Sequence, residues 1–174
     1  MSKKSEIWVS AVLYIAVGVI VISIILSAGI PLINKIKDRN TVIETKKLLF
    51  TLDDTLRTVA NEGPGSQREL PSFNIDAGKL IIDKDMDEIS WSIETKAFLL
   101  EPNAVVNEGV ISMSSEKSKK EGFYIVKLQT NYHNFIDLEL NSKFGNPIFG
   151  KYSLLIKHTG RFSGKRPIIE IVVN

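Results

Sequence analysis

The 174-residue sequence contains no cysteine, only two histidines and no large excess of either charge. Without cysteine, disulfide bonds, zinc–thiolate sites and thiol catalysis are excluded. The 22 lysines and arginines nearly balance the 20 aspartates and glutamates, so the net charge indicates neither a nucleic-acid partner nor a strongly acidic one. An Asn-x-Ser/Thr motif is also missing, which argues against N-glycosylation at that motif.

Motifs that carry catalysis are missing as well. The sequence has no phosphate-binding loop, no Gly-x-Ser-x-Gly elbow and no dinucleotide fingerprint. His133 lies in a turn-like stretch, and His158 lies at the end of an expected strand. Neither histidine has a partner at the spacing of a metal site or a catalytic triad. We therefore expect a protein that is not an enzyme and that binds no cofactor.

Charged residues are missing from one long stretch, residues 7–33, which is rich in Val, Ile and Leu. As a helix this stretch spans roughly 40 Å, which exceeds the roughly 30 Å hydrocarbon core of a bilayer. A helix satisfies its own backbone hydrogen bonds in lipid, whereas a core helix of a small domain need not be apolar on every side. Trp8 lies near one end, where an indole prefers the membrane interface. The sequence thus predicts a single membrane-spanning helix.

A cleaved secretory signal peptide is the alternative interpretation of this stretch. Such a peptide has an apolar region of about 7–15 residues followed by a small-residue cleavage site. The stretch here is longer and continues into a helical pattern, so we expect the helix to be retained. The basic residues that flank it are Lys3, Lys4, Lys35, Lys37 and Arg39. Since basic residues lie on both sides, the positive-inside count hardly distinguishes the two membrane orientations. We favour the N-terminus inside because few residues precede the helix.

The helical pattern continues beyond the apolar stretch, over residues 34–62. Six positions recur at alternating spacings of three and four and would form one stripe along a helix. They are Val42, Thr45, Leu49, Leu52, Leu56 and Val59. Glu44 can reach Lys47, and Asp53 can reach Arg57, and we expect both pairs on exposed faces.

The helix is expected to end at Gly63-Pro64-Gly65, a strong breaker that would form a hinge at residues 63–66. A continuous helix over residues 6–62 would be on the order of 80 Å long. Gly29 and Pro31 are the one expected kink, because proline removes a backbone donor and crowds the preceding turn. Either a simple bend or a locally melted segment fits this pair.

The remainder, residues 67–174, has the period of two that is typical of strands. About seven strands are expected, at residues 79–82, 89–95, 105–113, 123–129, 136–140, 152–157 and 169–173. Residues 114–122 are expected to form a solvated loop. The predicted fold class is α+β, a long N-terminal hydrophobic helix followed by an antiparallel β-sandwich or barrel-like head domain.

One acidic stretch is similar to a calcium-binding loop. Asp83, Asp85 and Asp87 alternate, and Glu94 stands at the twelfth position, as in an EF-hand. However, Glu88 occupies the sixth position, where the sharp turn needs glycine, and the flanking residues have a strand pattern. A charged hairpin turn is the better interpretation, with these three aspartates as the candidate ligands if a metal binds.

The N-terminus carries a family resemblance. Residues 3–10 have the sequence KKSEIWVS and lead directly into the apolar stretch. This resembles the class III signal peptide of archaeal type IV pilin-like proteins, including archaellins. Their short basic leader is cleaved before a hydrophobic helix that is retained, and a β-rich head follows that helix. The resemblance implies a cut between Ser5 and Glu6, which would remove residues 1–5.

The resemblance further implies a structural subunit of a surface filament. Its partners would be membrane lipid before assembly, then copies of itself, with a prepilin peptidase and pilus assembly machinery acting on it. The apolar helix would move from the cytoplasmic membrane into a bundle, where close packing favours small residues. The candidate packing positions are Ala11, Ala16, Gly18, Ser23 and Ser27. Ordinary membrane-helix composition explains the same residues equally well.

Two other functions stay open. The chain could be a solitary single-pass anchor for an extracytoplasmic β domain that binds or scaffolds, or it could be an ectoenzyme, for which no site is visible. A minor pilin-like protein of an assembly machine would stand between a filament subunit and a solitary anchor. The sequence gives no adhesion target, filament symmetry or strand order.

Overall fold

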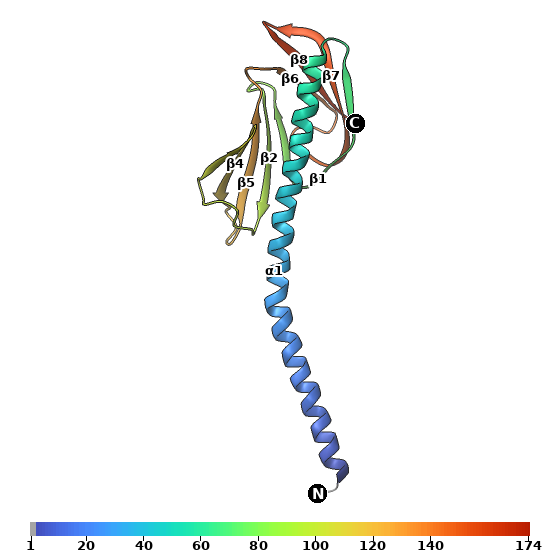
Figure 1. The fold of residues 1–174 in the computed structure, drawn as a ribbon, viewed down its shortest axis with the longest axis vertical. Helices are drawn as coiled ribbons and strands as arrows, with labels where there is room; N and C mark the ends of the chain where they lie inside the picture. The colour runs from blue at the N-terminus through green and yellow to red at the C-terminus, as the bar shows by residue number, and fades with distance from the viewer. Residues whose placement is uncertain (1–2) are drawn as a thin grey trace. The chain divides into compact units, whose positions relative to one another are not determined.

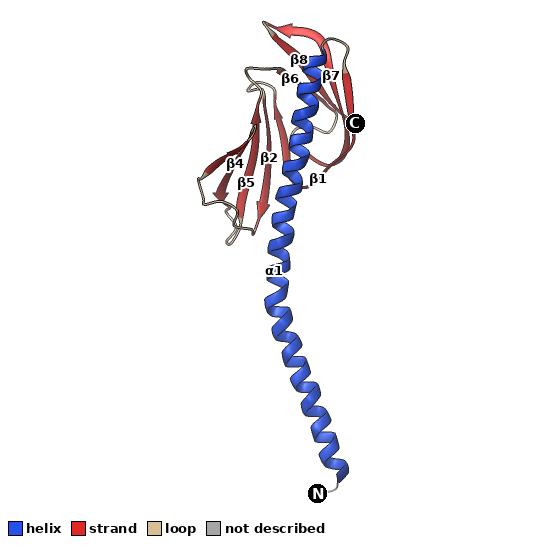
Figure 2. Cartoon of the chain, in the orientation of Figure 1, coloured by secondary structure: helices blue, strands red, loops and turns tan. Residues whose placement is uncertain are grey.

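The computed structural model describes the backbone of residues 3–174 and the side chains of residues 8–174. One helix, α1 (Lys3–Glu62), precedes eight strands (Figures 1 and 2). The chain divides into two compact units, residues 1–37 and residues 38–174. We call the first the apolar segment and the second the head, and the C-terminal part of α1 belongs to the head.

The head confirms the predicted α+β class. Its strands are β1 (Gln67–Asp83), β2 (Glu88–Thr95), β3 (Val105–Glu108), β4 (Ile111–Lys117), β5 (Tyr124–Asn131), β6 (Asp137–Ser142), β7 (Ile148–Ser163) and β8 (Arg166–Val173). They form one sheet in the order β3-β4-β5-β2-β1-β7-β8-β6. The sheet stays open, so the sandwich-like alternative fits and a closed barrel does not. All neighbours are antiparallel except β6 and β8, which are parallel, so the sheet is mostly antiparallel, in agreement with the predicted class.

Two long strands join the halves of this sheet. The first part of β1 pairs with β7, whereas its last five residues pair with β2. Between these parts the register shifts twice, after Leu70 and after Ile75. Such irregularities bend a strand and increase its twist. The sheet therefore folds over on itself, and Figure 1 shows the C-terminal part of α1 lying across it.

The predicted helical stripe is confirmed as the centre of the core. Val42, Leu49, Leu52, Leu56 and Val59 are all buried and belong to one cluster with residues of every strand except β3. The stripe's polar member, Thr45, is also buried and donates its hydroxyl hydrogen to the carbonyl oxygen of residue 41 at 2.9 Å. Because one face of α1 supplies these side chains, the helix and the sheet bury the same apolar surface.

Several predicted boundaries were wrong, and three of them have a clear local cause. Strand β1 begins 12 residues earlier than expected, because its first half carries polar side chains and Pro71 at the bend. The expected strand 105–113 is instead a hairpin, since Gly109 adopts a positive φ of 61° and separates β3 from β4. Strand β4 then continues to Lys117, and its Ser115 is buried, so the loop predicted at residues 114–122 begins only at Ser118.

The helix ends at the predicted breaker. Gly63 and Gly65 both have φ of 89°, a conformation that favours glycine. The Ser66 hydroxyl donates to the carbonyl oxygens of Val59 and Gly63, at 2.8 Å in each case. The Ser66 carbonyl in turn accepts a hydrogen bond from the His158 amide at 2.9 Å. The segment that was predicted as a hinge is thus a hydrogen-bonded turn that leads directly into β1.

Candidate functional site

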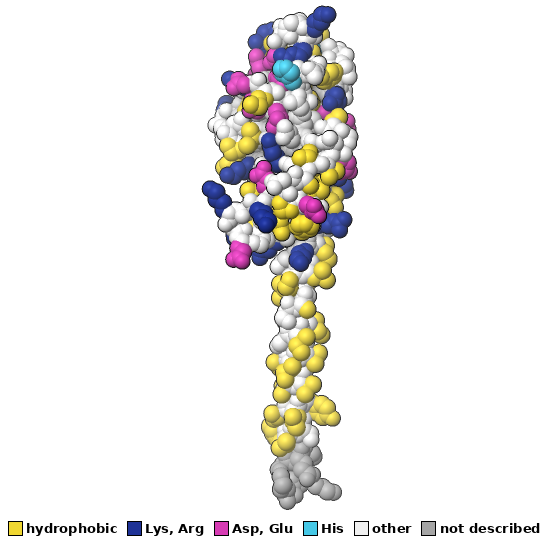
Figure 3. Space-filling view, turned by 90° about the vertical axis from the view of Figure 1, so that its left-hand side faces the viewer, with side chains coloured by type: hydrophobic (Ala, Val, Ile, Leu, Met, Phe, Trp, Pro, Cys, Tyr) yellow, Lys and Arg dark blue, Asp and Glu magenta, His cyan; other side chains and the backbone are white. Residues whose placement is uncertain are grey.

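The apolar segment presents hydrophobic side chains on every side. From Trp8 to Ile36 every large hydrophobic side chain is exposed, for example Ile15 at 68% and Ile25 at 63%. Figure 3 shows these side chains along the N-terminal part of the helix. Among the described residues this is the one helix long and apolar enough to cross a membrane, with a mean hydropathy of 2.9 and no part of that window buried. The segment therefore suggests membrane association or a signal anchor.

Helix geometry divides the five candidate packing positions between two faces. Successive residues of an α-helix are rotated by about 100°. Ala11 and Gly18 therefore share one face, and Ala16, Ser23 and Ser27 share the opposite one. A Cβ built on Gly18 meets nothing within 4 Å, so that position is open on the surface. The five residues do not make one stripe, and any packing that uses all of them needs neighbours on two sides.

The two serines satisfy their hydroxyl groups within the helix. Ser23 Oγ donates to the carbonyl oxygen of Val19 at 2.7 Å, and Ser27 Oγ donates to that of Ile24 at 2.9 Å. In hydrocarbon an unsatisfied hydroxyl would cost about 4 kcal/mol. These bonds remove that cost, so the serines are compatible with lipid as well as with protein neighbours.

The expected processing site lies at the first turn of α1. The backbone of Ser5 and Glu6 is helical, and their side chains lie outside the described residues. Further along, α1 runs without interruption through Gly29 and Pro31. The locally melted segment that the sequence left open at these residues is therefore not present in the structure.

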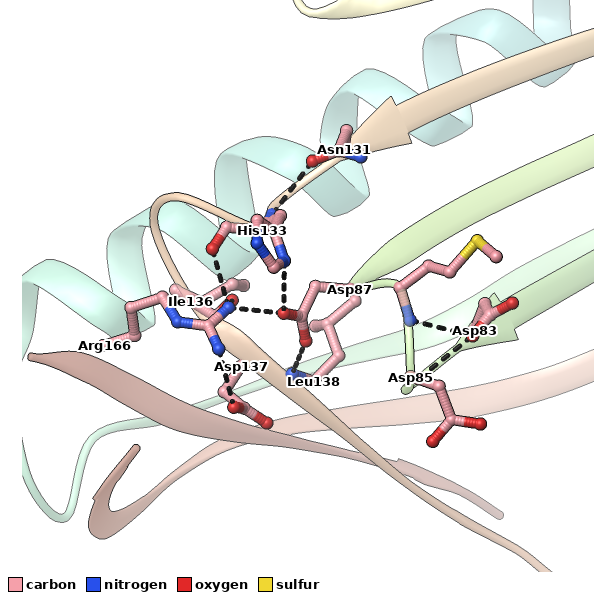
Figure 4. A network of polar contacts seen from close by, with 10 residues as sticks. Asp83, Asp85, Asp87, Asn131, His133, Ile136, Asp137, Leu138 and Arg166 are labelled. Carbon is pink, nitrogen blue, oxygen red and sulfur yellow. Dashed lines mark hydrogen bonds and ion pairs between the residues drawn. The ribbon is translucent and has the colours of Figure 1, made fainter. Parts of the chain in front are cut away.

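The three aspartates of the calcium-like stretch point to different partners (Figure 4). The stretch is the hairpin turn between β1 and β2, as the sequence favoured. Asp83 Oδ1 accepts hydrogen bonds from the Asp85 and Met86 amides, each at 3.0 Å. Asp87, with φ of 51°, is buried and turns away from both. Within the described residues no group of three histidine, aspartate or glutamate side chains is placed to hold a metal ion.

Asp87 is instead the centre of a polar network that ties separate elements of the head together. Its carboxylate forms an ion pair with Arg166 of β8 and accepts the Leu138 amide of β6 at 2.9 Å. Arg166 also donates to Asp137 at 3.1 Å and to the His133 carbonyl at 2.6 Å. The His133 ring lies 3.6 Å from the Asp87 carboxylate and is exposed. We call these residues the Asp87 network.

The sequence suggested that the second histidine, His158, lies at the end of a strand, but the structure places it inside β7. His158 is buried in the middle of β7, where the register with β8 shifts. Its Nδ1 accepts the Gly160 amide at 3.0 Å, and its ring lies 5.6 Å from the ring of Phe162. These contacts hold the His158 side chain inside the head, next to the register shift between β7 and β8.

A second buried carboxylate lies on α1. Asp53 pairs with Arg57 at 2.9–3.0 Å, as the spacing predicted, but it is only 2% exposed, so the expectation of an exposed pair was wrong. Burial, together with the nearby Asp53 carboxylate, raises the pKa of the Tyr132 hydroxyl. That hydroxyl makes no hydrogen bond of ordinary geometry. Arg57 also lies beside the aromatic rings here, with its guanidinium 5.2 Å from the Phe135 ring centroid.

Sequence reasoning named Asp53 and Asp87 but missed their long-range partners, because those partners are far away in the chain. Asp87 and Arg166 are 79 positions apart, and Asp53 and Tyr132 also come from distant elements. The one local indication that Asp53 is buried was its position beside the apolar stripe, one residue after Leu52. No comparable local signal marks Arg166, which begins β8 directly after a turn.

An open groove of about 270 Å³ lies on the exposed side of the head helix. Its lining is mostly polar: Thr51, Asp54, Thr55, Thr58, Arg68, Glu69 and Leu70. The Thr51 and Thr55 hydroxyls donate to carbonyl oxygens one turn earlier in α1. These bonds engage two of the groove's three threonine hydroxyls within the helix.

The order of elements is the remaining clue to function. One long apolar N-terminal helix followed by a β-sheet domain is consistent with a pilin-like architecture. No protein-family model matches the chain, and comparison with curated proteins and with solved structures likewise finds no match.

Proposed function

We propose that the protein is a structural subunit of an archaeal type IV pilus-like surface filament. One observation carries the proposal: a single helix is exposed and apolar on all sides in its first half and forms the core of a β domain with its second half. Such a helix needs lipid or other helices around the first half. The second half, covered by the sheet, keeps the head folded in either setting.

Transfer from lipid to a bundle is physically reasonable for this segment. Lipid tails are as apolar as the side chains of Ile15 or Ile25, so leaving the membrane carries no large hydrophobic cost when other helices replace the lipid. Association is then decided by close packing. Small side chains on two opposite faces, Ala11 and Gly18 on one and Ala16 on the other, support contacts with neighbours on both sides.

The basic leader supports the same proposal. Lys3 and Lys4 precede the apolar stretch, and Ser5–Glu6 stands where pilin-like precursors are cut. Processing there by a prepilin peptidase would remove residues 1–5 and release a mature chain that starts with the apolar helix. The precursor would lie in the cytoplasmic membrane, and the assembled protein would lie at the cell surface with its head outside, where it could serve adhesion.

The decisive experiment is the mass of the N-terminal peptide, taken from material sheared off the surface of native cells. We expect a peptide that begins at Glu6 and is recovered in the sheared fraction. Recovery of a peptide that begins at Met1 or Ser2, with the protein remaining in the membrane pellet, would overturn the proposal.

A solitary membrane anchor is the second candidate, and one observation favours it. The Ser23 and Ser27 hydroxyls are satisfied within their own helix, so the segment is stable in lipid without protein neighbours. Under this alternative the head would bind or scaffold outside the membrane, and the protein would be monomeric in detergent with an intact N-terminus.

A further inference from the structure

Two loops of the head lie at the end where the chain joins it from the apolar segment. The first residue of the head, Asp38, accepts hydrogen bonds from the Lys96 amide at 2.9 Å and from the Thr95 hydroxyl at 3.3 Å. The loop after β2 is thereby fixed beside Asp38. The turn between β4 and β5 joins it, because the Ser118 hydroxyl donates to Glu94 at 2.5 Å.

These loops combine exposed aromatic rings with lysines. Phe98 is 60% exposed and lies 5.4 Å from the Tyr124 ring in an edge-on arrangement. Phe123 lies under two ammonium groups, that of Lys120 at 4.1 Å and that of Lys96 at 5.0 Å. We call Lys96, Phe98, Lys119, Lys120 and Phe123 the lysine–aromatic patch.

The charge of the patch is available to a partner. Over the part of the chain that the structure describes, Lys96, Lys119 and Lys120 form no ion pair with an acidic side chain. Asp38 and Glu94 keep their charge while they accept hydrogen bonds from neutral donors, and neither forms an ion pair with a lysine of the patch among the described residues. Glu121 lies in the same turn, yet the lysines outnumber it.

Chain continuity keeps Asp38, to which the loop after β2 is bonded, close to the end of the apolar stretch. Only four residues separate Ile33, the last residue of the uncharged stretch, from Asp38. In a helix this is about 8 Å, which is comparable with the depth of the headgroup region on one side of a bilayer. When the apolar segment spans a membrane, chain continuity therefore keeps Asp38 near the headgroup region.

We propose that the lysine–aromatic patch binds anionic phospholipid headgroups while the apolar segment is in the membrane. The lysine ammonium groups would pair with lipid phosphates, and Phe98 would enter the interface, where aromatic side chains are preferred. Lysine stems lie along apolar surface while their charges stay in the polar layer. The head would thus be held against the membrane surface, and the proposal stands whether or not the protein polymerises.

The absence of cysteine makes a labelling test possible. We would reconstitute full-length Glu121→Cys, labelled with a fluorescent dye, in nanodiscs of phosphatidylcholine with or without phosphatidylglycerol. Some lipids would carry a quencher on the headgroup. We expect stronger quenching of this label when phosphatidylglycerol is present, and a loss of that increase at high salt, which screens the attraction.

A label at Ser163→Cys is the matched control. It lies in the exposed β7–β8 hairpin, and β7 is bonded to Ser66 just past the other end of the head helix, on the order of 36 Å from Asp38. Quenching there should be low and independent of lipid charge. Equal quenching at the two positions, or no effect of phosphatidylglycerol at residue 121, would overturn the proposal.

Charge removal tests the patch itself. In the Glu121→Cys background, Lys119→Gln with Lys120→Gln should abolish most of the phosphatidylglycerol effect, because each lysine near the surface contributes about fivefold in binding. The matched double variant, Lys143→Gln with Lys165→Gln, removes the same charge elsewhere on the head. It should leave the phosphatidylglycerol effect on quenching unchanged. Equal loss in both double variants would reduce the effect to net charge and contradict a specific patch.

Discussion

Asp87 joins three parts of the head through one carboxylate. It is 3% exposed, pairs with Arg166 and accepts the Leu138 amide. Removing one partner of a buried ion pair leaves the other uncompensated, which costs more than the pair itself contributes. The Asp87 network is therefore a structural element, and the stretch that is similar to a calcium loop is a fold determinant.

We predict that Asp87→Asn lowers the free energy of unfolding by about 1–3 kcal/mol, because Arg166 loses its buried partner and keeps only Asp137 as an ion-pair partner. The measurement is chemical denaturation of the full chain in detergent micelles. Asp85→Asn, at an exposed position of the same turn, should change stability by less than about 0.5 kcal/mol. Similar losses in both variants would show that the turn, rather than the buried pair, is what matters.

Gly78 allows β1 to pass close to β2. It has φ of +83°, and a Cβ there would lie 2.2 Å from the Ser92 carbonyl oxygen. Gly122 has a similar φ of +74° but open space around it. We predict that Gly122→Ala costs about 1–2 kcal/mol, the backbone strain alone, whereas Gly78→Ala costs clearly more because two backbones must separate. Thermal unfolding of both variants measures the difference, and equal costs would contradict the close approach.

Tyr132 gives the head a pH dependence in the alkaline range. Its pKa is raised by burial and by Asp53, so the folded state holds the phenolic proton more tightly than the unfolded chain does. The stabilisation is fully present below the unfolded pKa of about 10 and is lost as pH rises further. Tyr132→Phe should remove this decline, with a small effect at neutral pH because the hydroxyl makes no ordinary hydrogen bond. Parallel stability curves for both proteins above pH 10 would contradict this.

At the scale of elements, the helix could be predicted from sequence far better than the sheet. The helical stripe repeats within single turns, so local spacing alone placed Val42, Leu49 and Leu56 on one face of the helix. Strand boundaries depend on partners elsewhere: the first half of β1 has a largely polar, exposed face and is ordered by pairing with β7. The parallel pairing of β6 with β8 likewise has no local signature.

The same argument explains what was missed in the site. Asp53 lies next to the stripe, but its burial depends on Tyr132 and Arg57 folding over it. Asp87 was singled out by its spacing within a turn, which is local information, whereas its partner Arg166 comes from a distant part of the chain. Residues that act through long-range ion pairs are the ones that local patterns cannot identify.

The stripe also makes the helix and sheet one folding unit, which gives a prediction at the scale of elements. Leu52 is fully buried against the sheet, so Leu52→Ala should lower the free energy of unfolding by about 2–5 kcal/mol. Ile43→Ala truncates a side chain of similar size that is 38% exposed on the same helix and should cost distinctly less. Denaturation in micelles compares them, and an equal cost would mean that the stripe does not carry the core.

At the scale of the whole molecule, the two units need different surroundings. The head buries its apolar surface internally, whereas the apolar segment exposes all of its own. A change in the segment should therefore alter association without altering the fold of the head. This separation is what allows membrane insertion and assembly to be tested independently in the same chain.

We predict that Ala16→Leu and Gly18→Leu leave membrane insertion and head stability unchanged but impair filament assembly. Each variant keeps the helix apolar while it adds bulk on one of the two faces where small residues allow close approach. Val17→Leu, which enlarges an already bulky exposed side chain between them, is the matched control. Electron microscopy of sheared surface material, together with the protein content of the membrane fraction, provides the measurement. Undiminished filaments in both variants would remove the packing role of these faces, and a loss in only one would identify the face that contacts the neighbouring subunit.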